Sequence, residues 1–146
     1  MDDAAGVHSA VPASGAEPTT DLHTVLYIED NLSNLALVQR ILARRPEVRL
    51  IQAVQGRAGL NLAREHRPDL ILLDLHLPDI HGSEVLRLVK DDPTTRTIPV
   101  VVISADATTG QIERLIAAGA RDYLTKPLDV RKLLSLLDEA LKGRGV

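Results

Sequence analysis

The sequence contains no cysteine, which excludes disulfide bonds, zinc-thiolate sites and thiol catalysis. Tryptophan and phenylalanine are also absent, so Tyr27 and Tyr123 are the only residues of the Phe, Trp and Tyr class. Hydrophobic residues nevertheless make up 45% of the chain. We therefore expect a core built from Leu, Ile, Val and Ala, in a protein that suits a reducing compartment.

Positive charge is not in excess, and long apolar runs are missing. The formal net charge is −3, which gives no electrostatic basis for nucleic acid as the main partner. No apolar stretch approaches the roughly 18 residues that a membrane-spanning helix needs. The acidic start, Met1-Asp2-Asp3, lacks the apolar segment of a secretory signal. We expect a soluble, cytoplasmic protein that binds neither nucleic acid nor membrane.

The length of 146 residues suits one ordinary domain. Residues 1–22 are rich in Ala, Gly, Ser, Pro and Thr and show no helical or strand periodicity, which predicts a disordered N-terminal tail or linker. Residues 23–142 are expected to form the domain, followed by a short C-terminal tail over residues 143–146. No internal repeat is visible.

From residue 23 onward, apolar runs alternate regularly with helical patterns. Five strand–helix units in strict alternation predict a parallel sheet that is covered on both faces. The second strand contains Arg49 and Gln52, which favours a place at the sheet edge. We predict an α/β fold with a doubly wound five-stranded parallel sheet in the order 2-1-3-4-5. The predicted strands are residues 23–28, 48–54, 69–74, 98–104 and 122–124, and the predicted helices are residues 31–44, 57–66, 82–91, 109–118 and 129–141.

Polar side chains with complementary chemistry stand at the ends of four predicted strands. Asp74 ends the third strand, and Glu29 and Asp30 follow the first. Ser104 ends the fourth strand, and Lys126 follows the fifth. In α/β folds the carboxyl ends of parallel strands meet at one edge, where ligands bind. We therefore expect these five side chains to lie close together.

This set of groups suits a divalent cation and a phosphoryl group. Mg²⁺ prefers oxygen ligands such as carboxylates, and clustered carboxylates repel one another without a cation. Asp74 would attack phosphorus in line and form an aspartyl phosphate. Lys126 and Ser104 would then bind phosphoryl oxygens. Taken singly each residue has an ordinary explanation, such as a helix cap for Asp30, so the prediction depends on their combination.

Four sequence segments resemble one known family. They are VLYIEDN at 25–31, LILLDLHLPDIHG at 70–82, VVVISA at 100–105 and YLTKP at 123–127. These segments are similar to the receiver domain (CheY-like) of response regulators in two-component and phosphorelay signalling. The resemblance covers about residues 23–142 and implies a flavodoxin-like (βα)5 fold.

The resemblance assigns roles to individual residues around the metal. Asp74 matches the phosphoacceptor, and Glu29 and Asp30 match the acidic metal-binding pair. The backbone carbonyl of His76 matches the third protein ligand of the metal, which in this family is Mg²⁺ or Mn²⁺. The His76 side chain is interpreted as a rim group, which could, like Asp106, modulate how water reaches the phosphoryl group.

Further matches concern the phosphoryl group and the conformational switch. Ser104 matches the switch hydroxyl, and Ala105 matches the small residue that leaves access to the phosphoryl group. Lys126 matches the phosphate-contacting lysine, and Pro127 matches the proline that often follows it through a cis bond. Tyr123 matches the aromatic switch residue of the last strand.

The implied function is that of a signalling module and not of an enzyme, because only its own phosphoryl transfer and autodephosphorylation would be catalysed. A histidine kinase or histidine phosphotransfer protein would phosphorylate Asp74, which would switch the surface of the fourth helix, fifth strand and fifth helix toward an unidentified protein target. A receiver fold acting as a phosphorylation-independent interaction module stays an alternative. A haloacid-dehalogenase-like phosphatase is disfavoured, because that class has a second Asp where His76 stands.

Two further expectations concern partners. The helix over residues 31–44 is apolar on more than one face; the resemblance favours Leu37, Val38 and Ile41 as core. The additional apolar side chains near Leu32 and Leu35 have two interpretations. They either form a docking surface for the histidine-bearing helix or reflect the ordinary variation in the width of a helix's apolar face. The chain itself is either a stand-alone receiver or part of a larger protein such as a hybrid kinase, and the initial Met slightly favours the former.

Overall fold

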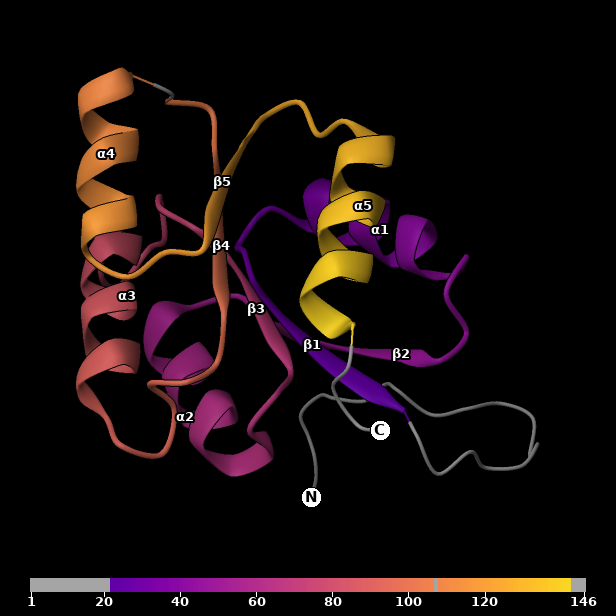
Figure 1. The fold of residues 1–146 in the computed structure, drawn as a ribbon, viewed down its shortest axis with the longest axis horizontal. Coiled ribbons are helices and arrows are strands. Elements are labelled where there is room, and N and C mark those ends of the chain that lie inside the picture. Colours follow the sequence, from indigo (N-terminus) through magenta and orange to yellow (C-terminus); the bar gives the residue numbers. More distant parts are fainter. Residues whose placement is uncertain (1–21, 107, 143–146) are drawn as a thin grey trace.

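The computed structural model of the protein describes residues 22–106 and 108–142. The predicted tails lie outside the described residues, except for Leu22. Five strands alternate with five helices in the described chain, which confirms the predicted α/β class (Figure 1). The strands are β1 (His23–Ile28), β2 (Val48–Ala53), β3 (Leu70–Asp74), β4 (Val100–Ser104) and β5 (Asp122–Thr125), and the helices are α1 (Leu32–Leu42), α2 (Gly56–His66), α3 (Gly82–Asp91), α4 (Thr109–Ala117) and α5 (Val130–Leu141).

The strands form one parallel sheet in the order β2-β1-β3-β4-β5, as predicted. The register places Leu72 of β3 opposite Tyr27 of β1 on one side and opposite Val101 of β4 on the other. Every strand therefore ends at the same edge of the sheet. The more polar β2 lies at one side of the sheet, which confirms its predicted edge position.

Helices cover both faces of the sheet. Figure 1 shows α1 and α5 on one face and α2, α3 and α4 on the other. Neighbouring residues of β1 face opposite sides: Leu26 and Ile28 pack in the cluster beneath α2, α3 and α4, whereas Val25 and Tyr27 pack in the cluster beneath α1 and α5. This alternation is the period of two that strands impose on side chains. It explains why continuous apolar runs were needed for the central strands.

Two interior strands, β3 and β4, are buried along their whole length. Removal of apolar surface from water is the main force that holds such strands in place, at about 25 cal/mol per Å². Asp74 and Ser104 are the last residues of these strands. Their polar groups are therefore carried by the most firmly packed part of the molecule.

Gly119 lies just beyond the end of α4. Its φ angle is 114°, a conformation that costs glycine little and other residues more. The amide of Gly119 donates to the carbonyl of Ile116 over 3.0 Å, and the amide of Ala120 donates to that of Leu115 over 3.0 Å. These bonds satisfy carbonyl groups that a helix end would otherwise leave free and direct the chain into β5.

Helix α1 differs from expectation at two residues, of which Leu37 is only partly buried instead of being a core residue. Leu35 is only 4% exposed and packs with the sheet, so its interpretation as a docking residue is wrong. Leu35 lies three and seven residues from Val38 and Leu42, which are both buried, and this spacing places them on one helix face. Leu32 is 74% exposed and keeps the interpretation as a contact residue.

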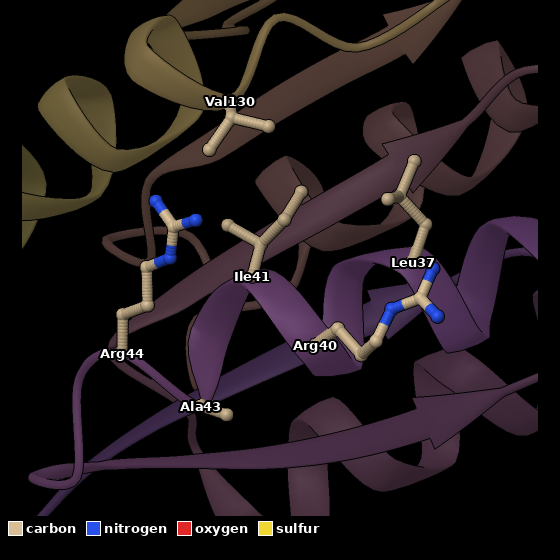
Figure 2. Close-up of a pocket in the computed structure, with 6 residues that line it drawn as sticks. All are labelled: Leu37, Arg40, Ile41, Ala43, Arg44 and Val130. Atoms are coloured by element: carbon tan, nitrogen blue, oxygen red, sulfur yellow. The ribbon is translucent and has the colours of Figure 1, made fainter.

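A shallow groove lies between α1 and the start of α5 (Figure 2). Three α1 residues line it together with Val130 and with Ala43 and Arg44, which directly follow the helix. The charged groups are the guanidinium groups of Arg40 and Arg44 (Figure 2). None of the strand-end polar residues lines this groove, so it is separate from the predicted chemistry. Across the described ranges, no helix has the length and apolar character that crossing a membrane requires.

Candidate functional site

Three carboxylates meet at the carboxyl edge of the sheet. Glu29 and Asp30 follow β1, and Asp74 ends the adjacent strand β3. One oxygen from each lies within 4.8 Å of those of the other two. Glu29 and Asp74 are 1% and 2% exposed, whereas Asp30 is exposed. The neighbouring positions of β1 and β3 therefore bring together the acids that the sequence singled out.

Lys126 approaches the acidic cluster from the opposite direction along the strand order, where β5 is the last strand. It follows β5, and its Nζ atom donates to Glu29 Oε1 over 2.9 Å and to Asp74 Oδ1 over 3.2 Å. The side chain is 23% exposed. The peptide bond between Lys126 and Pro127 is cis. The ammonium thus forms hydrogen bonds with two of the three acids, Glu29 and Asp74, and not with Asp30.

Glu29 is held by donors that the sequence analysis did not identify. Its Oε1 atom accepts from Tyr27 Oη (3.0 Å), Asn34 Nδ2 (3.2 Å) and Lys126 Nζ, and its Oε2 atom accepts from the amide of Asn31 (3.1 Å). Strand residues two apart point to the same side, so the spacing of Tyr27 and Glu29 was the available signal. Glu29 has the most fixed carboxylate of the three acids.

Burial and charge shift the pKa values of these groups in different directions. Burial raises the pKa of Asp74, the charge of Glu29 adds to this, and Lys126 only partly offsets both. Burial also raises the pKa of Glu29, but the hydrogen bonds from Lys126 and the Asn31 amide outweigh burial and lower it overall. Burial lowers the pKa of Lys126, and its contacts with Glu29 and Asp74 outweigh that effect. The charge of Asp74 is therefore less fully compensated than that of Glu29.

The donor set fits a hard divalent cation. Carboxylate oxygens are the ligands that Mg²⁺ and Mn²⁺ prefer. A cation would compensate the charge that Lys126 leaves on Asp74, and Asp30 is accessible from solvent. The amide of His76 donates to Asp74 Oδ2 over 3.2 Å, which places this backbone segment beside the acids.

Ser104 lies beside Asp74 at the end of β4. Asp74 is paired with Ile103 in the sheet register, so Ser104 is the next residue along the neighbouring strand. Ser104 is fully buried, and its hydroxyl accepts from the amide of Asp106 over 3.2 Å. Ala105 is exposed. A hydroxyl and a small open residue thus border the carboxylate cluster.

Asp106 contacts residues on two sides of the site. Its Oδ2 atom lies 3.0 Å from His76 Nε2, and its backbone carbonyl accepts a hydrogen bond from the Tyr123 hydroxyl. Tyr123 is half-buried on β5 and packs against the core beneath α2, α3 and α4. Neither contact was predicted, because both need the three-dimensional course of the loop after β4. Asp106 thereby links the loop after β3 to β5.

Comparisons with known proteins agree with this geometry. The profile of the family "Response regulator receiver domain" matches residues 25–138. The polar-differentiation response regulator DivK of Brucella anthropi is 39% identical over 118 residues, which cover 81% of this chain and 95% of DivK. The likeness therefore includes every strand and helix that carries the site.

Solved structures share the fold and hold metal ions. The receiver domain of a sensor histidine kinase from Pseudomonas aeruginosa PAO1, with magnesium coordinated in its active-site cleft, has a TM-score of 0.74 and 28% identity over 82% of this chain and 98% of its own. The Mn²⁺-bound form of the response regulator Rcp1 has a TM-score of 0.69 and 29% identity over 83% of this chain and 93% of its own.

Proposed function

Given that this chain belongs to the response-regulator receiver family, we propose that Asp74 is the residue that accepts the phosphoryl group. The chain is a phosphoacceptor and signalling module, not a classical enzyme. The observation that carries the assignment is the position of Asp74, which is a buried carboxylate between an acidic pair and Lys126. The proposed receiver domain extends over residues 23–142.

The proposed metal ligands are Glu29, Asp30, Asp74 and the backbone carbonyl of His76. Their support is the carboxylate cluster together with the magnesium and manganese ions of the two similar structures. When bound, Mg²⁺ or Mn²⁺ would neutralise charge on the acids and on the phosphoryl oxygens. Asp30 is the ligand that an arriving ion meets first, because it is the exposed member of the three.

In the proposed reaction, an Asp74 carboxylate oxygen attacks phosphorus in line. A P–O bond to Asp74 forms as the P–N bond of the donor phosphohistidine breaks, and the electron pair of that bond returns to the imidazole. Lys126, already 3.2 Å from Asp74 Oδ1, would bind one phosphoryl oxygen. The Ser104 hydroxyl would donate to another, and Ala105 would leave space for the approach.

Histidine kinases phosphorylate receiver domains. The finer proposal is that a histidine kinase or a histidine phosphotransfer protein is the donor for this chain, and that the exposed Leu32 contacts its histidine-bearing helix. The site would then be loaded in the cytoplasm, where the ATP that feeds such a kinase is found.

The proposed output is a change of the surface formed by α4, β5 and α5. Phosphorylation would draw Ser104 toward Asp74, and Tyr123 would leave its hydrogen bond to Asp106 and move inward, with Pro127 helping to shape the loop beyond Lys126. Such a local charge change biases a packing arrangement that has two states. Tyr123→Ala should keep phosphorylation of Asp74 but weaken discrimination by the downstream protein. Loss of phosphorylation in this variant would contradict the switch role.

Intact-mass analysis tests the central proposal. Wild type and Asp74→Asn are incubated with acetyl phosphate, with and without Mg²⁺. We expect one phosphoryl adduct on the wild type that requires Mg²⁺ and is absent from the variant. No adduct, under conditions that label a known receiver, would favour an interaction module that works without phosphorylation.

A further inference from the structure

Tyr27 is a polar residue in an otherwise apolar part of the core. It lies on β1, between β2 and β3, and packs in the cluster beneath α1 and α5. Its side chain is fully buried. A buried tyrosine hydroxyl needs a hydrogen-bond partner, because an unpaired one costs about 1–3 kcal/mol. Its partner is Glu29 Oε1, at 3.0 Å.

The choice of acceptor connects the core to the acidic cluster. Any nearby carbonyl oxygen could accept the hydrogen bond of this buried hydroxyl. The hydroxyl instead donates to a carboxylate that belongs to the site. The Oε1 atom of Glu29 also accepts from Asn34 Nδ2 and Lys126 Nζ. A carboxylate offers about four acceptor positions over its two oxygens, so these donors fix the rotation of the Glu29 carboxylate.

The donors to Oε1 differ in how firmly they are held. Lys126 lies on a loop and divides its ammonium between Glu29 and Asp74, at 2.9 and 3.2 Å. Asn34 lies on α1 and is only partly buried. Tyr27 is fixed by two neighbouring strands and by the packing of its ring. It is therefore the donor that stays in place when Lys126 turns toward a phosphoryl oxygen on Asp74.

We propose that the Tyr27 hydroxyl is a positioning group that holds the Glu29 carboxylate in its metal-binding orientation from within the core. This inference rests on the proposed metal site. Tyr27 does not itself bind the ion and acts only through Glu29. Removal of a hydrogen-bond partner behind a metal ligand typically weakens metal affinity by about 10–100-fold. Because Asn31 and Asn34 would still donate to Glu29, we expect a loss at the lower end of this range.

Tyr27→Phe in the whole 146-residue chain is the direct test, because it removes the hydroxyl and keeps the ring. Binding of Mn²⁺ is measured by the electron paramagnetic resonance signal of the free ion, and binding of Mg²⁺ by calorimetry. We expect the dissociation constants of both ions to rise about 10-fold.

Thr95→Val provides a matched control. Thr95 is 2% exposed, and its hydroxyl donates to the carbonyl of Val89 over 2.8 Å. This variant therefore also loses a buried hydroxyl and its hydrogen bond, but away from the acids. We expect a comparable loss of stability and an unchanged metal dissociation constant.

A spectroscopic measurement adds a readout that a merely structural tyrosine would not give. In a Tyr123→Phe background, Tyr27 is the only tyrosine. A hydroxyl that donates to a metal-binding carboxylate should show a change in tyrosine absorption as Mg²⁺ is added, and Glu29→Gln should abolish the change.

Each outcome bears on a separate claim. Equal or tighter binding of metal by Tyr27→Phe would overturn the positioning role and leave the metal site intact. Equal losses of metal affinity in Tyr27→Phe and Thr95→Val would also overturn the positioning role, since the effect would then come from general destabilisation. Absence of metal binding by the wild type would overturn the proposed metal site and this inference with it.

Discussion

The Nζ atom of Lys126 lies 2.9 Å from Oε1 of Glu29, a contact between residues that are 97 positions apart in the chain. The ammonium thus sits nearer to the acid that already has three other donors than to Asp74. Asp74 consequently keeps more of its negative charge uncompensated. Burial raises the pKa of both acids, but the donors around Glu29 outweigh burial there, whereas at Asp74 burial and the charge of Glu29 prevail, so the two pKa values move in opposite directions.

Asp74→Asn should stabilise the protein at neutral pH. Burial and the charge of Glu29 raise the pKa of Asp74 in the folded state, so the unfolded chain ionises at lower pH than the folded one. Stability is therefore lost as the pH rises above the ordinary value near 3.9. We expect a gain of about 1 kcal/mol at pH 7 that disappears below that value, measured by urea unfolding at both pH values.

Asp92→Asn is the control with the opposite sign. The amide of Thr94 and the guanidinium of Arg64 hold the pKa of Asp92 at about 2. Its ionised form stabilises the fold above the ordinary pKa, and that contribution is lost as the pH falls toward about 2. This variant should lose stability at pH 7. A matching gain in both variants would contradict the electrostatic explanation.

Lys126→Met should make stability depend strongly on divalent cations. Removal of the ammonium leaves the carboxylates of Glu29 and Asp74 without their shared positive partner. We expect the free energy of unfolding to fall by about 2 kcal/mol without metal. Because a bound cation restores positive charge, Mg²⁺ should stabilise this variant more than the wild type. Urea unfolding with and without Mg²⁺ measures both; equal stability of variant and wild type without metal would be evidence against the charge argument.

Asp79→Ala should loosen the start of α2. Asp79 accepts from the amides of Gly56 and Arg57 over 2.7 and 2.9 Å, whereas Gln55, the residue before the helix, provides no side-chain cap. Loss of such a cap costs about 1 kcal/mol. Hydrogen exchange at both amides should accelerate, and Asp79→Asn, which keeps one acceptor oxygen, should show a smaller change. Unchanged exchange in the Ala variant would rule out this capping role.

The contact between His76 and Asp106 should affect the lifetime of a phosphoryl group more than stability. Both side chains are exposed, at 58% and 60%, so each Ala substitution should change the unfolding free energy by less than about 0.5 kcal/mol. The pair nevertheless bridges the segments that follow Asp74 and Ser104, and its loss opens a path for water. The adduct mass should therefore disappear faster in either variant. The double variant should decay no faster than the single ones, because one contact is lost in each case; an unaltered decay rate would refute the proposal.

The strand order and the meeting of the acids could be predicted because both follow from short-range patterns. Apolar runs and their alternation with helices specify the layers of the fold, and parallel strands bring the residues at their ends together. Gly119 was predictable for a similarly local reason, since few other residues adopt its backbone conformation readily.

The donors around Glu29 and the role of Leu35 were harder to predict. Asn34 contacts Glu29 only because α1 starts at a particular angle to the sheet, and that angle depends on the packing of the whole helix. Leu35 belongs to an apolar stripe that is wider than one helix face usually needs. The sequence pattern alone did not show which side of that stripe would meet the sheet.

A chain that emerges from the ribosome presents Glu29 and Asp74 well before Lys126. The ammonium follows β5, the last strand of the sheet, which docks beside β4 at the edge opposite β2. Until that strand is in place, the acids lack their protein counter-charge and the phosphoryl group lacks one of its proposed ligands. A partly synthesised or truncated chain should therefore accept a phosphoryl group poorly, because the proposed site is complete only after the last strand has docked.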